Sequence, residues 1–243
     1  MNYYISVVVM ALVPAIILLW YVYKQDTIEK EPASLLGKLL LGGIASAGIS
    51  YFLESISDIF IIIVSMRAVR EVFVYTFLAG STVALIEEGT KFFFLKLLSW
   101  KSKAFDYRFD GIVYAVFVSL GFAAVENILY VLEGGFSTAV IRGLISLPGH
   151  TSFAIIMGIY YGRAKEASGR NDGNLMHINL RKAYWLAVFF HASFDITLMF
   201  ENDISLLLFA GVAVIMYSVL FVKLHKESQM DTVVDHRDND EII

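Results

Sequence analysis

Cysteine is absent from the 243 residues, and charged residues are scarce. Without cysteine the chain can form no disulfide, no thiolate metal site and no cysteine nucleophile. Asp, Glu, Lys and Arg together make up 17% of the chain, against about 25% in a typical soluble domain. The sequence also has no broad basic field of the kind that binds nucleic acid. Soluble, disordered and nucleic-acid-binding classes are therefore disfavoured.

Hydrophobic residues take the place of the missing charge. They make up 58% of the sequence, which includes 19 Phe, and the mean hydropathy is +0.67. A soluble globule of this composition would expose large apolar patches to water. The composition therefore predicts an all-α, polytopic membrane helix bundle, in which each span needs about 20 apolar residues.

Several stretches are long and apolar enough to cross a bilayer. We identify seven, at residues 3–23, 35–53, 72–98, 109–132, 138–161, 183–200 and 203–222. Most Lys and Arg residues lie in alternate loops between these stretches, whereas the opposite loops hold only Arg67 and Arg70. Because Lys and Arg concentrate in cytoplasmic loops, the sequence predicts seven spans with the N-terminus outside and the C-terminus in the cytoplasm.

A single transmembrane domain over residues 1–225 accounts for nearly all of the chain. Residues 226–243 are polar and acidic, which is typical of disordered segments, so we predict a disordered cytoplasmic tail there. No soluble domain is recognisable, and any activity is therefore expected within the membrane part.

Titratable side chains interrupt four successive spans. A charged group in hydrocarbon costs at least about 2.5–3.5 kcal/mol, so these residues cannot face lipid, and we expect them to converge inside the bundle. They are Glu87 and Glu88 in the third span, Glu126 in the fourth, His150 in the fifth, and His191 and Asp195 in the sixth.

Helical spacing relates some of these residues to one another. Lys91 follows Glu87 by four positions and Glu88 by three, so it can offset one of the two carboxylates. His191 and Asp195 are four positions apart and share one face of a helix. Asp195 could therefore orient the imidazole or stabilise its charged form.

Carboxylates and imidazoles that share a desolvated site can activate water. A buried Glu can serve as general base, and a His can donate a hydrogen bond to a developing oxyanion. Peptide hydrolysis inside a membrane would need this arrangement together with a cavity that admits water.

Each feature taken alone also has a structural explanation. The Glu–Lys pair could be a packing or insertion device, and His191 and Asp195 could form an ordinary interhelical hydrogen bond. Asn127, beside Glu126, could bond across helices, and Arg142 could pair with a buried acid. The coincidence of all these polar residues at one depth favours a functional site.

Five motifs of the sequence occur in a characteristic order and resemble the PrsW family of bacterial intramembrane proteases over almost the whole chain. They are Glu87-Glu88-Gly89-Thr90-Lys91, Phe109-Asp110-Gly111-Ile112-Val113-Tyr114, Ser119-Leu120-Gly121-Phe122-Ala123 with Glu126-Asn127-Ile128-Leu129-Tyr130, the lone His150, and His191-Ala192-Ser193-Phe194-Asp195.

This resemblance implies a protease of the bacterial plasma membrane. Its expected partners are the lipid bilayer and a membrane-anchored anti-sigma factor, in which it would make the first (site-1) cut on the extracytoplasmic side. A second intramembrane protease would then complete the release of the sigma factor. No nucleic acid and no cofactor are expected.

The resemblance also suggests roles for the site residues. Glu87 and Glu88 would activate water, with Glu87 as the base. His191 would stabilise the oxyanion and would itself be held by Asp195.

One position departs from the related CAAX-processing and bacteriocin-processing proteases, which carry His where this chain has Glu126. His150 could supply the missing imidazole, and Glu126 and His150 would then position the water or the scissile carbonyl. Lys91 and Asn127 are assigned supporting roles.

Three alternatives stay open at this stage. A metal-dependent protease could hold zinc through His150, His191 and the carboxylates, although no helix carries the His-Glu-x-x-His pattern. A transporter could use the same residues to relay protons, and a non-enzymatic scaffold could use them to bind a partner's helix. The fate of the partner discriminates among them, because only a protease leaves it shorter.

Overall fold

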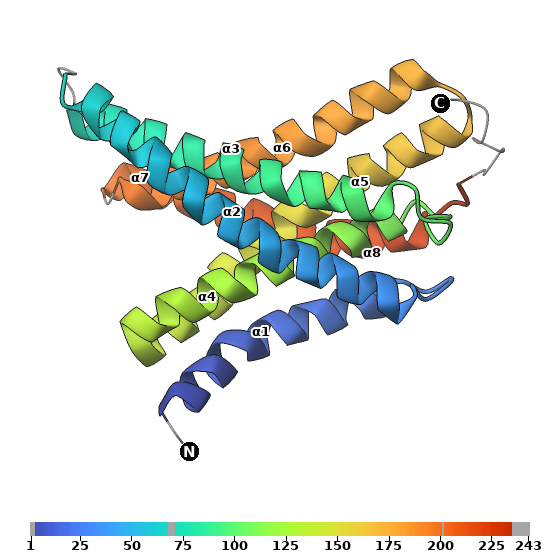
Figure 1. Ribbon diagram of the computed structural model, residues 1–243, viewed down its shortest axis with the longest axis horizontal. Coiled ribbons are helices and arrows are strands. Elements are labelled where there is room, and N and C mark those ends of the chain that lie inside the picture. The colour runs from blue at the N-terminus through green and yellow to red at the C-terminus, as the bar shows by residue number, and fades with distance from the viewer. Residues whose placement is uncertain (1–2, 68–70, 201, 235–243) are drawn as a thin grey trace.

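The computed structural model describes residues 3–67, 71–200 and 202–234. Its regular secondary structure in these ranges is helical (Figure 1), which confirms the predicted all-α class. The helices are α1 (Tyr3–Gln25), α2 (Ala33–Ser65), α3 (Glu71–Ser99), α4 (Asp110–Leu144), α5 (Ser146–Gly169), α6 (Gly173–Met199), α7 (Asp203–Ser218), the π-helical turn η1 (Val219–Lys223) and α8 (Leu224–Gln229).

Five helical stretches within the described residues are long and apolar enough to cross a membrane. They are Ile5–Gln25, Ala33–Ser65, Glu71–Ser99, Asp110–Gly169 and Asp203–Gln229. The fourth stretch contains both α4 and α5, and α6 is not among the five. The chain is thus a multi-pass membrane bundle, while the count of seven spans and their orientation stay predictions.

α2 and α6 are among the helices that extend well beyond the predicted spans. α2 continues from the predicted end at residue 53 to Ser65, because the apolar run that follows contains no Gly or Pro to end the helix. α6 begins at Gly173, ten residues before the predicted start, where the Asp172 side chain accepts a hydrogen bond from the backbone N–H of Leu175. This contact is an ordinary N-cap.

α4 is the central helix of the bundle. Every residue from Asp110 to Ala123 is buried, and the helix packs against α1, α2 and α5. Glycines allow its closest crossing. A Cβ atom on Gly43 of α2 would lie 2.0 Å from the carbonyl oxygen of Val118, and one on Gly121 would lie 2.4 Å from that of Leu40. The backbones of α2 and α4 therefore meet with no side chain between them.

The chain reverses within α4 at Gly135. This residue has φ +69° and ψ −152°, a conformation that only glycine adopts without strain. In a straight helix Arg142 would lie about 24 Å beyond Glu126 along the axis, yet its Nη2 is 2.9 Å from Glu126 Oε1. Residues 136–144, called here the returning helix, therefore fold back towards the first part of α4.

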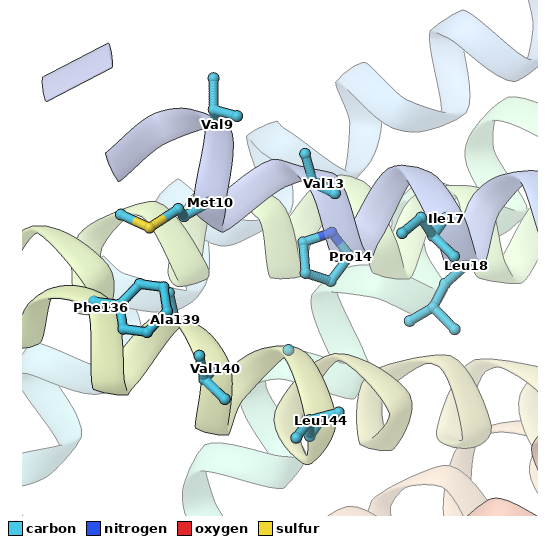
Figure 2. A pocket seen from close by; sticks show the side chains of 11 residues that line it. Val9, Met10, Val13, Pro14, Ile17, Leu18, Phe136, Ala139, Val140 and Leu144 are labelled. Atoms are coloured by element: carbon cyan, nitrogen blue, oxygen red, sulfur yellow. The ribbon is translucent and has the colours of Figure 1, made fainter. Parts of the chain in front are cut away.

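A groove of about 540 Å³ lies between α1 and the returning helix (Figure 2). Its lining is apolar and includes Met10 and Ile17 from α1 and Phe136 and Leu144 from the returning helix. The two helices are therefore not packed closely against each other along this groove.

The start of the predicted disordered tail is folded, which corrects the prediction for residues 226–234. Residue 226 lies within α8, and Val233 forms an antiparallel bridge with Tyr107. The Asp231 carboxylate accepts a hydrogen bond from the N–H of Phe109 at 2.8 Å. The physical reason is that the connection before α4 offers unpaired backbone groups with which these residues bond. Residues 235–243, the rest of the predicted tail, lie outside the described residues.

Candidate active site

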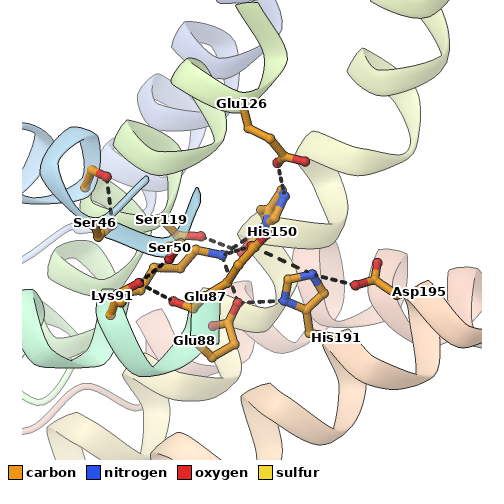
Figure 3. A network of polar contacts seen from close by, with 12 residues as sticks. Ser46, Ser50, Glu87, Glu88, Lys91, Ser119, Glu126, His150, His191 and Asp195 are labelled. Carbon is orange, nitrogen blue, oxygen red and sulfur yellow. Dashed lines mark hydrogen bonds and ion pairs between the residues drawn. The ribbon is translucent and has the colours of Figure 1, made fainter. Parts of the chain in front are cut away.

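The six residues predicted to converge lie together at the meeting of α3, α4, α5 and α6 (Figure 3). Glu87, Glu88, His150 and His191 are each at most 5% exposed. Glu126 and Asp195 are more open, with side chains 22% and 21% exposed. The structure therefore brings the whole predicted set together, with its open side at Glu126 and Asp195.

Lys91 lies in the middle of the cluster. Its Nζ donates to Glu87 Oε2 and to Glu88 Oε1, both at 2.9 Å, and it also lies 3.3 Å from His150 Nδ1. The ammonium sits 4.0 Å above the ring of Phe122, a cation–π contact. The spacing predicted that Lys91 could offset one carboxylate, and in the structure this lysine contacts both.

His150 stands between Lys91 and Glu126. Its Nε2 lies 2.9 Å from Glu126 Oε2, on the opposite side of the ring from the contact with Lys91. Because an ionised carboxylate can only accept a hydrogen bond, Nε2 must be the protonated nitrogen of the neutral imidazole. Nδ1 is then the acceptor for the Lys91 ammonium. The two neighbours together select one tautomer of His150.

His191 has Glu88 as its nearest acidic partner. Its Nδ1 lies 2.9 Å from Glu88 Oε1, whereas its Nε2 lies 3.4 Å from Asp195 Oδ2 and 3.9 Å from Glu87 Oε2. The ring stacks on Phe153 at 4.9 Å. The expected contact with Asp195 is present, but Glu88 is in a better position to orient the imidazole.

Asn127 and Arg142 extend the network to α1. The Arg142 Nε donates to Asn127 Oδ1 at 2.9 Å, and Asn127 Nδ2 donates to the carbonyl oxygen of Ala11 at 2.7 Å. Arg142 also pairs with Glu126. The hydrogen bonds of Asn127 thus match its predicted role in helix packing. Arg142 pairs with an acid, as one interpretation of the sequence proposed, although Glu126 is only half-buried.

Glu87, Glu88, His150 and His191 form a group that could hold a metal ion. One potential ligand atom from each lies within 4.8 Å of the others. Carboxylate oxygens and imidazole nitrogens are ligands that zinc accepts, and the contact between Glu126 and His150 resembles the acid that supports a metal-bound imidazole. The donor set fits a divalent cation, although the Lys91 ammonium contacts three of its four members.

The sequence analysis missed Glu54, because the predicted second span ended one residue before it. Its Oε1 is buried and has no hydrogen-bond partner among the described residues. Glu54 lies close enough to Lys91 and Glu126 to interact with them electrostatically. The signal that could have found it is the four-residue spacing of Ser46, Ser50 and Glu54, which puts all three on one helix face.

Comparisons with known proteins place this geometry in context. Residues 31–224 match the family model described as PrsW family intramembrane metalloprotease. The chain is 34% identical over 190 residues to Protease PrsW of Geobacillus kaustophilus (strain HTA426), covering 78% of each chain. It is 29% identical over 231 residues to Protease PrsW of Oceanobacillus iheyensis, covering 95% of this chain and 100% of that protein. No solved structure matches it.

Proposed function

Because the chain belongs to the PrsW family of intramembrane proteases, we propose that it makes the first cut in a single-span anti-sigma factor. The cut would lie on the extracytoplasmic side of the bacterial plasma membrane and would lead to release of the sigma factor. The observation that carries the chemical part of this proposal is the buried cluster of two glutamates and two histidines. Family membership favours a protease over the transporter and the scaffold.

Glu87 is the proposed general base. It would take a proton from water as the water oxygen attacks the scissile carbonyl carbon, and it would return a proton to the leaving amine. The hydrogen bonds support this choice, since Glu88 Oε1 accepts from Lys91 and contacts His191, whereas Glu87 has Lys91 as its one close partner. With fewer donors, the Glu87 carboxylate keeps more acceptor capacity for a proton from water.

His191 is the proposed donor to the oxyanion. Glu88 at one ring nitrogen and Asp195 near the other would stabilise the imidazolium that such a role requires. Glu126 and His150, joined at 2.9 Å, would position the water or the scissile carbonyl. Lys91 would keep the two glutamates in place.

A metal-assisted form of the same reaction is the second candidate. The closeness of the four donor atoms and the description of the matched family as a metalloprotease favour it. His150, His191 and one of the two glutamates would be the ligands, which leaves the fourth position of a tetrahedral zinc for water. Zinc bound there would polarise the scissile carbonyl and supply a water more acidic than bulk water.

The decisive experiment is cleavage in liposomes of a single-span anti-sigma factor from the same cell. Wild type would be compared with Glu87→Gln and with Glu133→Gln, a control at an exposed acid of α4, with and without a chelator. We expect cleavage by wild type and by the control and none by Glu87→Gln.

Resistance to the chelator would support the glutamate mechanism. Loss of cleavage that zinc restores would support the metal-assisted form. Full cleavage by folded Glu87→Gln would rule out Glu87 as the base.

A further inference from the structure

Arg142 is a half-buried cation that the proposed reaction does not use. It lies on the returning helix, and its side chain is 14% exposed. The guanidinium contacts Glu126 and Asn127, each at 2.9 Å, and lies 4.0 Å from the ring centre of Tyr130. All three partners belong to the part of α4 before Gly135, so the guanidinium joins the two parts of α4.

Glu126 links Arg142 to the active site. Its Oε1 faces Arg142 Nη2 and its Oε2 faces His150 Nε2, both at 2.9 Å. Each carboxylate oxygen therefore has its own partner, the guanidinium charge at Oε1 and the imidazole at Oε2. Without Arg142, the Glu126 carboxylate would be free to rotate, since the remaining contact is a single bond to the imidazole.

Most large apolar side chains of the returning helix face outwards, while Ala139 packs in a small apolar cluster with Val7 and Ala11 of α1. Phe136 is 70% exposed, and Ile141 and Leu144 are similarly open. The apolar groove separates part of this helix from α1 (Figure 2). Arg142 joins the returning helix to the site through an ion pair of Nη2 with Glu126, in which Nη2 makes no hydrogen bond among the described residues, and through the hydrogen bond of Nε to Asn127.

We propose that Arg142 is a positioning residue of the active site, which fixes the Glu126 carboxylate and through it the ring orientation and tautomer of His150. The imidazole then presents Nδ1 to Lys91 and to the two glutamates beyond it. The effect on cleavage rests on the proposed function, whereas the effect on His150 does not.

Kinetics test the proposal with Arg142→Ala and Arg142→Lys in liposomes. The control is Arg170→Ala, because Arg170 is 66% exposed and pairs with Glu166 four positions earlier. We expect kcat of Arg142→Ala to fall roughly 10–100-fold, the usual effect of removing a residue that orients a ligand or catalytic group. KM should stay within about twofold of wild type, and Arg142→Lys should recover part of the loss because it keeps the charge without the planar fork.

Chemical rescue separates positioning from folding. Guanidinium ion added to Arg142→Ala should restore part of kcat, and it should do nothing for Glu126→Gln. A double-mutant cycle tests whether Arg142 acts through Glu126. If it does, Arg142→Ala should cause no further loss of kcat in the Glu126→Gln background. Additive losses, or wild-type kcat in Arg142→Ala, would overturn the proposal.

A direct readout of His150 needs no substrate. In protein labelled with ¹⁵N-histidine and held in nanodiscs, Arg142→Ala and Arg142→Lys should shift the ring signals of His150 and leave those of His177, a helix residue outside the site, unchanged. Unchanged His150 signals in both variants would overturn the proposal. If wild type cleaves no substrate, the proposed function fails, and these signals still decide the role of Arg142.

Discussion

Lys91 is the cation on which the buried double glutamate depends. It is 1% exposed and donates to both carboxylates. Removing one partner of a buried ion pair leaves an uncompensated charge, at a cost of about 3–5 kcal/mol. We therefore expect Lys91→Met, which keeps the length of the chain but not its charge, to lower the free energy of unfolding by that amount.

The measurement is unfolding in mixed micelles followed by circular dichroism. The control is Lys96→Met, which removes an exposed lysine from the same helix and should leave stability nearly unchanged. Equal stability of Lys91→Met and wild type would show that the two glutamates do not need the ammonium.

Glu88 and Asp195, the two acids nearest to His191, should contribute unequally. Glu88 lies 2.9 Å from one ring nitrogen and Asp195 lies 3.4 Å from the other. We expect Glu88→Gln to slow cleavage by about 100-fold and Asp195→Asn by about tenfold, the two ends of the range for partners that orient an imidazole. Single-turnover rates in liposomes measure both, and the reverse order would contradict the geometry.

At the scale of helices, the crossing of α2 and α4 sets the position of the site. A Cβ atom on Gly43 would meet the Val118 carbonyl at 2.0 Å, whereas one on Gly48 would meet nothing within 4 Å. Gly43→Ala must therefore push the two helices apart, and we expect it to cost about 1–3 kcal/mol of stability. Unfolding in micelles measures the loss of stability, and the rate of cleavage in liposomes measures the effect of the displaced helices on the site.

Gly48→Ala is the matched control on the same helix. It should stabilise the protein by roughly 0.5–1 kcal/mol, since alanine suits a helix better than glycine. A loss of stability at Gly48 equal to that at Gly43 would mean that helix crossing is not the cause.

At the scale of the whole molecule, Glu31 joins two distant parts of the chain. It lies in the connection between α1 and α2, outside the membrane-spanning helices, and accepts a hydrogen bond from the hydroxyl of Tyr114 on α4. Burial raises the pKa of Glu31 from 4.5 to about 7. Burial likewise raises the pKa of Asp26, in the same connection, to about 6.

These shifts predict how stability depends on pH. The folded state keeps the Glu31 proton up to about pH 7, whereas the unfolded chain releases it near pH 4.5. The folded state therefore binds more protons in this window, and stability should fall as the pH rises through it. Glu31→Gln should weaken the fall in Tm without abolishing it, since Asp26 is shifted the same way, and Glu133→Gln, at an exposed acid of α4, should leave it unchanged. A steeper fall in Glu31→Gln would contradict the assignment.

Much of the architecture could be predicted from the sequence because it depends on local composition. Apolar runs long enough to span hydrocarbon predicted helices, and the cost of charge in lipid required Glu87, Glu126, His150 and His191 to face inwards together. The helix ends were less predictable. Glu54 was missed because two acids, Glu54 and Asp58, interrupt the apolar run after residue 53 and predicted the end of the span there, although α2 runs to Ser65.

The sequence by itself determined that this is a helical membrane protein with a buried acid and histidine cluster, and its motifs determined the family. Only the tertiary structure decided which partners meet. Spacing along one helix suggested Asp195 for His191, but packing of α3 against α6 brings Glu88 closer. Likewise, the predicted spans left a break at residues 133–137, but only the structure shows that the reversal at Gly135 brings Arg142 to Glu126. Contacts between helices depend on backbone reversals and crossing points, which the periodicity of a single helix does not contain.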